Sequence, residues 1–143
     1  MNAAFGEALV DEARTWAGTP WHHAGRVKRV GVDCLGLVTM SLAAIGRPVE
    51  DPTDYPMGDT FAEMRAGFAR YADEVGREAM AQGCVLLFRS DGRGRPAMFN
   101  HCAIWTGEGI IHAWNGGPRR VVEHPLEDSW LRLLDSVWRW RGA

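Results

Sequence analysis

The sequence predicts an α+β fold, with N-terminal helices packed on a central antiparallel sheet of about five strands. In the first half of the chain, apolar residues recur at the spacing of amphipathic helices. From residue 83 onward, short apolar runs are separated by turn residues, which is typical of strands. No repeat, linker or low-complexity tract divides the 143 residues, so we expect one domain over residues 1–143.

Three helices are expected before the sheet. The first covers residues 5–16 and ends before Gly18 and Pro20. The second begins at Cys34 and ends near residue 46, and the third covers residues 60–71. Proline and aspartate are frequent over residues 48–59, so we expect a loop there.

Five strands are expected in the second half of the chain, at residues 85–88, 101–106, 110–114, 121–123 and 136–140. Asp91-Gly92 and Gly94 predict a turn or hairpin tip over residues 89–96. Residues 125–134 are expected to form a short helix before the last strand.

The composition excludes several classes of protein. A net charge of −2 does not favour a nucleic-acid partner, and no apolar run is long enough for membrane insertion. Cysteines at positions 34, 84 and 102 do not form a disulfide framework. The N-terminus lacks the pattern of a secretory signal peptide, so we expect a protein made in a reducing cytoplasm and carried to any other site by something else. We expect no cofactor and no bound metal ion.

Cys34 is the first candidate for chemistry. Asp33 is a good N-cap residue, which places Cys34 in the first turn of the second helix. Free N–H groups and the helix dipole favour an anion there, and the pKa of a thiol at such a position can fall to roughly 3.5–7.5. A cysteine in this place is therefore a candidate nucleophile, and the alternative is a buried cysteine that only packs.

Two histidines on neighbouring strands are candidates for the partners of this thiol. Gly107-Glu108 suits a two-residue hairpin loop, which pairs Trp105 with Ile110. In that register His101 and His112 lie on one sheet face as diagonal neighbours, with backbones roughly 7–8 Å apart. A slip by half a residue in the turn centre would place them on opposite faces.

A nucleophile at a helix start, a base on one strand and an orienting group on the next form the pattern of a catalytic triad. Cys34 would attack, His101 would hold its proton and later donate it to the leaving amine, and His112 would orient His101. The alternative is a metal site built from Cys34, His101, Cys102 and His112. No pair of these has the Cys-x-x-Cys spacing, and strand alternation points Cys102 away from His101.

Five short motifs resemble those of the NlpC-type cell-wall peptidases, a papain-like group of cysteine endopeptidases. They agree with the family in order and spacing over residues 15–115. The motifs are Gly18-Thr19-Pro20-Trp21, Asp33-Cys34-Leu35-Gly36-Leu37, Gly83-Cys84-Val85-Leu86-Leu87-Phe88, His101-Cys102-Ala103-Ile104 and Ile111-His112-Ala113. The resemblance implies a papain-like fold and hydrolysis of a peptide bond in the peptidoglycan stem peptide, commonly that between D-γ-glutamate and meso-diaminopimelate.

The Asp-Cys-Leu-Gly variant resembles a branch found in phage tail gene clusters and gene transfer agents. This branch implies a bacterial protein carried in the tail of a phage-like particle, with tail proteins as partners. Trp21 stands where the family usually has Tyr, and Leu35 replaces a Ser, which bears on stem-peptide specificity. The resemblance suggests Trp21 as a neighbour of the oxyanion and Asp33 as a group that meets the substrate's amine. Another acyl transfer, such as amide cleavage or transpeptidation, and an inactive tail protein are the alternatives.

Overall fold

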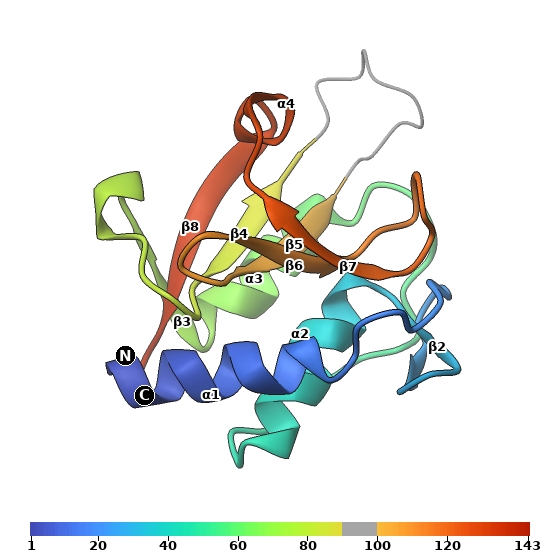
Figure 1. Cartoon of the computed structure of the whole chain (residues 1–143), viewed down its shortest axis with the longest axis horizontal. Helices are drawn as coiled ribbons and strands as arrows, with labels where there is room; N and C mark the ends of the chain where they lie inside the picture. The colour runs from blue at the N-terminus through green and yellow to red at the C-terminus, as the bar shows by residue number, and fades with distance from the viewer. Residues whose placement is uncertain (90–99) are drawn as a thin grey trace.

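A six-stranded antiparallel sheet forms the centre of the molecule, with strand order β3-β8-β4-β5-β6-β7 (Figure 1). The structure is a computed structural model and describes residues 1–89 and 100–143. The strands are β3 (Ala72–Val75), β4 (Val85–Phe88), β5 (His101–Trp105), β6 (Gly109–Ala113), β7 (Val121–Pro125) and β8 (Leu134–Trp140). A small hairpin, β1 (Arg26–Val27) and β2 (Gly31–Val32), lies apart from this sheet. The hairpin tip predicted at residues 89–96 falls almost wholly outside the described residues.

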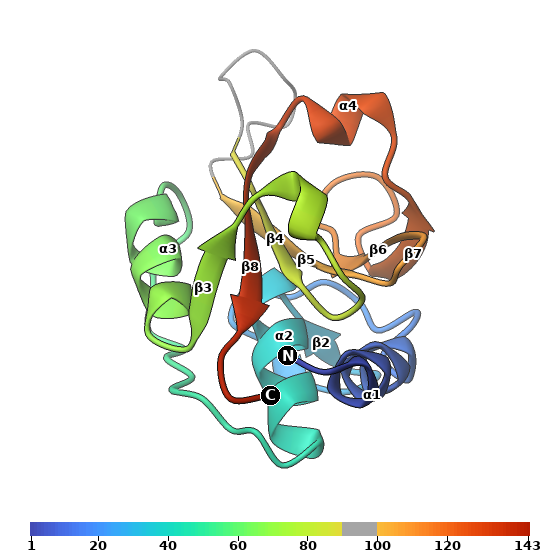
Figure 2. The same ribbon diagram turned by 90° about the vertical axis from the view of Figure 1, so that its left-hand side faces the viewer.

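Helices cover both faces of the sheet. α1 (Ala3–Arg14), α2 (Cys34–Ala44) and α3 (Phe61–Ala69) lie on one side, and α4 (Asp128–Leu131) lies on the other, as the turned view in Figure 2 shows. A single 3-10 turn, η1 (Arg77–Ala79), joins β3 to β4. The chain ends meet, since Asn2 N donates a 2.9 Å hydrogen bond to Ala143 O. No helix among the described residues has both the length and the apolar character needed to cross a membrane.

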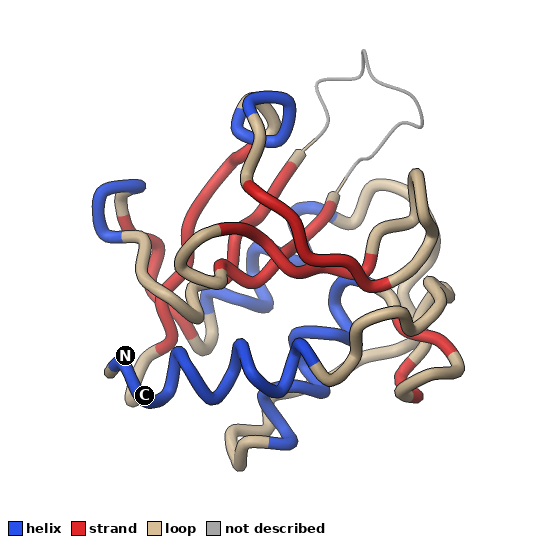
Figure 3. Tube along the Cα trace, in the orientation of Figure 1, coloured by secondary structure: helices blue, strands red, loops and turns tan. Residues whose placement is uncertain are grey.

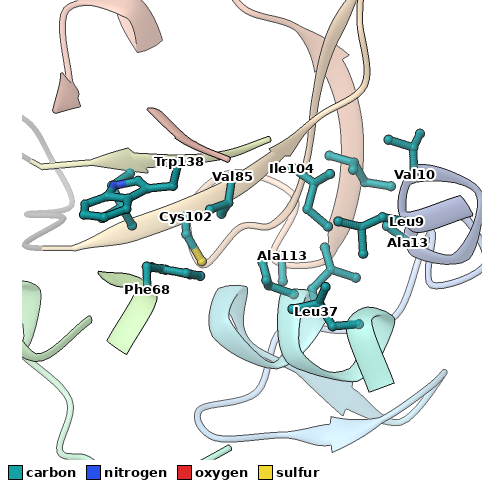
Figure 4. Packing of buried hydrophobic residues seen from close by; sticks show 14 of the residues in the cluster. Leu9, Val10, Ala13, Leu37, Phe68, Val85, Cys102, Ile104, Ala113 and Trp138 are labelled. Atoms are coloured by element: carbon teal, nitrogen blue, oxygen red, sulfur yellow. The ribbon is translucent and has the colours of Figure 1, made fainter. Parts of the chain in front are cut away.

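Strand β5 carries side chains to both halves of the core. Cys102 and Ile104 pack with Leu37 of α2 and Leu9 of α1 on the helix side of the sheet (Figure 4). Ala103 faces the opposite cluster, which contains Trp130 of α4. This alternation follows from the two-residue period of a strand. By the same alternation, His101 at the start of β5 lies on the face covered by α4, where its ring centroid is 5.6 Å from that of Trp130.

The predicted α+β class, the helices before the sheet and the five predicted strands are confirmed (Figure 3). The sheet has six strands rather than five, because β3 was not predicted. Its sequence, Ala-Asp-Glu-Val, exposes both acidic residues and pairs only with β8 at the sheet edge. An edge strand with two adjacent acidic residues has no clear apolar alternation for sequence reasoning to detect.

The predicted register of the β5–β6 hairpin is confirmed. Trp105 pairs with Ile110, and Ile104 pairs with Ile111. The loop needs glycine at its first central position, where Gly107 has φ +99°. Thr106 N donates to Gly109 O at 2.9 Å, which closes the turn. This register places His101 and His112 on the same face of the sheet.

Candidate active site

Cys34 occupies the first position of α2. Its preceding residue, Asp33, caps the helix by accepting a 2.8 Å hydrogen bond from Gly36 N. The helix runs along the sheet, and α2 contacts both β5 and β6. The cap therefore fixes where the helix begins, and the sheet contacts fix where its first turn lies relative to the two histidine-bearing strands.

The Asp33 carboxylate is buried and bonded from several directions. One oxygen accepts from Gly36 N and from Arg26 Nη1 at 3.0 Å. The other accepts from Ala24 N at 2.8 Å and from the Tyr55 hydroxyl. Burial, followed by the bond to this carboxylate, raises the pKa of Tyr55 above its usual range. These bonds tie the start of α2 to the hairpin and to the loop at residues 48–59, so a substrate amine would compete with four donors for Asp33.

Gly36 has a steric reason to be glycine. A Cβ there would lie 2.6 Å from Arg26 Nη1 and 2.6 Å from Gly25 O. The guanidinium lies against this glycine and donates hydrogen bonds to Asp33 and Asp51. The Asp-Cys-x-Gly pattern thus combines a cap, a candidate nucleophile and the space that the capping network needs.

Three histidines from adjacent strands form a continuous hydrogen-bonded chain. His101 Nε2 of β5 lies 2.6 Å from His112 Nδ1 of β6. His112 Nε2 lies 2.8 Å from His124 Nε2 of β7. His124 Nδ1 lies 2.8 Å from the carbonyl oxygen of Pro125. Because Nε2 of His101 is bonded to His112, only Nδ1 of that ring remains for Cys34.

Trp130 of α4 covers this chain. Its ring centroid lies 5.6 Å from that of His101, 4.9 Å from His112 and 5.9 Å from His124. His112 is fully buried, and burial, together with the charges that its two neighbours can carry, lowers its pKa to about 2. His112 is therefore neutral near pH 7, and it can both donate and accept one hydrogen bond.

The Cys34 thiol is acidic. Hydrogen bonds from the Cys102 thiol and from His101, together with the positive charge that His101 can carry, lower the pKa of Cys34 to about 5 against the opposing effect of burial. The same bond and burial raise the pKa of Cys102 well above its usual range. Cys34 is therefore the acidic member of the pair, and Cys102 donates.

A cleft of about 850 Å³ opens onto these groups. Cys34 and His101 both line it, and Trp21, Trp114 and Trp130 contribute aromatic walls. Its further lining comes from α2, α3 and the loop at residues 48–59. A cleft of this size has room beside the thiol for a ligand of several residues.

The structure brings together Cys34, His101, His112, Trp21 and Asp33, the residues that the sequence singled out. Among residues 1–89 and 100–143, no three His, Cys, Asp or Glu side chains are arranged to hold a metal ion. Cys102 faces the helix layer, and its contact with Cys34 was not foreseen.

His124 was also missed. The fourth strand was expected to end at Glu123, whereas β7 continues to Pro125. His112 pairs with Val122 across the β6–β7 ladder, which puts His124 diagonal to His112 on the same face. Continuing the predicted strand by one residue would have suggested this contact.

No family model matches the sequence, and no curated protein sequence matches it. Several solved structures, however, are similar to this chain. An NLP/P60 family protein from Staphylococcus aureus, described as similar to lipoprotein, aligns at 20% identity and TM-score 0.70 over 98% of this chain and 42% of that protein. The NlpC/p60 domain of the peptidoglycan hydrolase SagA aligns at 25% identity and TM-score 0.64 over 94% of this chain and 97% of that domain.

RipD from Mycobacterium tuberculosis, described as a non-catalytic NlpC/p60 domain protein adapted to peptidoglycan binding, aligns at 12% identity and TM-score 0.62 over 97% of this chain and 98% of that one. The chain thus spans less than half the length of the staphylococcal protein but nearly all of the other two domains. The fold is that of the NlpC-type, papain-like cell-wall proteins, as the sequence motifs predict. This fold occurs in hydrolases and in non-catalytic proteins, so the site must decide between them.

Proposed function

We propose that this protein is a cysteine endopeptidase that hydrolyses a peptide bond of the peptidoglycan stem peptide. The observation that carries the proposal is the cleft shared by Cys34 and His101, with His101 itself bonded to His112 at 2.6 Å, and the lowered pKa of Cys34 supports it. A thiolate beside an oriented imidazole is the arrangement that acyl transfer requires.

The proposed reaction uses these groups in turn. His101 Nδ1 takes the Cys34 proton, and the thiolate attacks the scissile carbonyl carbon. The Cys34 backbone N–H at the start of α2 would donate to the developing oxyanion, because the first N–H groups of a helix have no partner within it and the Gly36 N–H is already bonded to Asp33. His101 then returns the proton to the leaving amine, which leaves a thioester on Cys34. Water attacks the thioester while His101 takes a proton from it, and the carboxylic acid and free thiol are released.

The substrate bond that we propose joins D-γ-glutamate to meso-diaminopimelate. The motifs support this choice, and the similarity to the hydrolase domain of SagA supports peptidoglycan as the target. Purified diaminopimelate-type sacculi would be digested with the protein, and the products would be identified by mass spectrometry. Products with a new D-glutamate terminus support the proposal. Intact sacculi with a fully alkylatable Cys34 would contradict it.

A peptidoglycan-binding role without catalysis is the second candidate, because RipD combines this fold with that role. The retained Cys34, His101 and His112 favour catalysis, and an amidase or transpeptidase would use the same three groups. Sacculus pull-down and product analysis of the wild-type protein separate the roles. Binding without any product supports the second candidate.

The proposed setting is the tail of a phage-like particle, where the protein would open the cell wall locally during DNA delivery. The Asp33-Cys34-Leu35-Gly36 variant supports this setting. Mass spectrometry of purified particles tests it, since the setting requires the protein in particles as well as in the producing cell. Its absence from particles would refute the setting and would leave the hydrolase proposal intact.

A further inference from the structure

We infer that His124 is a positioning residue. Its bond to the Pro125 carbonyl sets the direction of hydrogen-bond donation along the histidine chain, that is, which ring donates and which accepts in each bond. This direction keeps the proton-accepting nitrogen of His101 towards Cys34. This inference rests on the proposed function, because it assigns His124 a part in activating the same thiol. It follows from the three contacts within the histidine chain and from the donor and acceptor rules of imidazole.

The direction begins at the backbone. A carbonyl oxygen can only accept, so His124 Nδ1, 2.8 Å from Pro125 O, must carry a hydrogen. The Glu127 carboxylate, 3.8 Å from the same nitrogen, favours that hydrogen as well. A neutral His124 therefore presents a bare Nε2 to the next ring.

The direction then passes along the chain. His112 Nε2, 2.8 Å from the bare nitrogen of His124, donates to it. His112 is neutral, because burial lowers its pKa, so its Nδ1 is bare and accepts from His101 Nε2 at 2.6 Å. His101 keeps its Nε2 hydrogen throughout, and its Nδ1 alone exchanges a proton with Cys34. The thiol–imidazole pair and the thiolate–imidazolium pair both satisfy the whole chain.

The reverse direction disables the base. If His112 donated from Nδ1, the neutral His101 would carry its hydrogen on the nitrogen that faces Cys34. That ring could not accept the thiol proton without losing its bond to His112. The titratable groups that face His124 are His112 on β6 and Glu127 at the start of α4, and Trp114 and Trp130 shield the rings. The surroundings thus favour the productive direction.

Three variants separate the hydrogen bond from other effects. His124→Leu removes the acceptor for His112 Nε2. His124→Gln keeps an amide oxygen that can accept at the same place. Glu127→Gln removes the nearby charge and leaves the Pro125 carbonyl. The pH dependence of Cys34 alkylation by iodoacetamide reports the thiolate, because only the thiolate reacts. Two-bond proton–nitrogen spectra of ¹⁵N-labelled histidine report which ring nitrogen carries hydrogen.

The wild-type spectrum should show His124 with hydrogen on Nδ1 and His112 with hydrogen on Nε2. His124→Leu should raise the pH midpoint of Cys34 alkylation by about 0.5–1 unit, the effect of one hydrogen bond. His124→Gln and Glu127→Gln should stay close to wild type. Hydrogen on His112 Nδ1 in the wild-type protein overturns the inference, and so does a folded His124→Leu variant with an unchanged midpoint. If His124→Leu fails to fold, the wild-type spectrum decides alone.

Neither measurement uses peptidoglycan. A protein with the expected spectrum and alkylation midpoints that leaves sacculi intact would retain this inference and lose the proposed function. A protein that digests sacculi but shows the reverse tautomers would retain the proposed function and lose this inference.

Discussion

His101 Nε2 and His112 Nδ1 lie 2.6 Å apart, on neighbouring strands joined by the turn at Gly107-Glu108. That short contact exists only because the turn sets one register and not the adjacent one. The turn residues take no part in the chemistry, but the register that they set determines whether the two rings meet.

We predict that His112→Ala lowers kcat/KM by roughly 10–10³-fold, less than loss of the nucleophile, because orientation is only part of transition-state stabilisation. His112→Asn should retain more activity, since its amide oxygen can still accept from His101. The measurement is kcat/KM on a purified stem peptide, with folding checked by circular dichroism. Wild-type activity in His112→Ala would reduce the triad to Cys34 and His101.

Cys34 should alkylate much faster than the other two cysteines near neutral pH. Its pKa of about 5 makes it largely thiolate above that pH, so its alkylation rate should rise through pH 5 and then level off. Burial raises the pKa of Cys84, and the hydrogen bond to Cys34 together with burial raises the pKa of Cys102. Both thiols therefore stay protonated near neutral pH and should alkylate slowly. Peptide mapping after timed iodoacetamide treatment gives the three rates. Similar rates in the folded protein would argue against a catalytic Cys34.

Cys102→Ala should raise the pH midpoint of Cys34 alkylation. The hydrogen bond from the Cys102 thiol has the largest effect among those that lower the pKa of Cys34, and alanine removes this donor. Cys102→Ser is the matched control, because its hydroxyl can still donate in a site of similar size. We expect the serine variant to lie closer to wild type than the alanine variant. Equal midpoints for all three proteins would show that Cys102 only packs.

Gly36→Ala should lower the free energy of unfolding by about 1–3 kcal/mol, because the added methyl group meets Arg26 and the Gly25 carbonyl. Gly67→Ala in α3 is the matched control, since no atom lies within 4 Å of a Cβ built there. Alanine in an open helical position should add about 0.5–1 kcal/mol. Urea unfolding of both variants measures the difference. A stable Gly36→Ala protein with wild-type activity would refute the steric role of Gly36.

The sequence was sufficient for the parts of the site that depend on local rules. The Asp33 cap places Cys34 at a helix start, and the Gly107-Glu108 turn gives the register of His101 and His112. Both rest on short-range geometry that residue types specify directly. The motif resemblance then gave the fold, which the structural neighbours confirm.

Contacts between separate segments of the chain could not be predicted from the sequence in the same way. The bond from Arg26 to Asp33 closes across the β1–β2 hairpin, 7 residues apart, and the bond from Tyr55 comes from a loop without regular structure, 22 residues away. The edge strand β3 lacks an apolar pattern, and His124 lies one residue beyond the strand that its sequence indicated. In each case the partner across space, and not the local sequence, determines the structure.

The most direct test of the account compares wild-type protein with Cys34→Ala and Cys102→Ala on purified diaminopimelate-type sacculi, with released peptides followed by mass spectrometry. We predict that wild type releases stem-peptide fragments, that Cys34→Ala releases none because no other group can form the thioester, and that Cys102→Ala remains active. Equal release by wild type and a folded Cys34→Ala variant would contradict the central claim that Cys34 is the nucleophile.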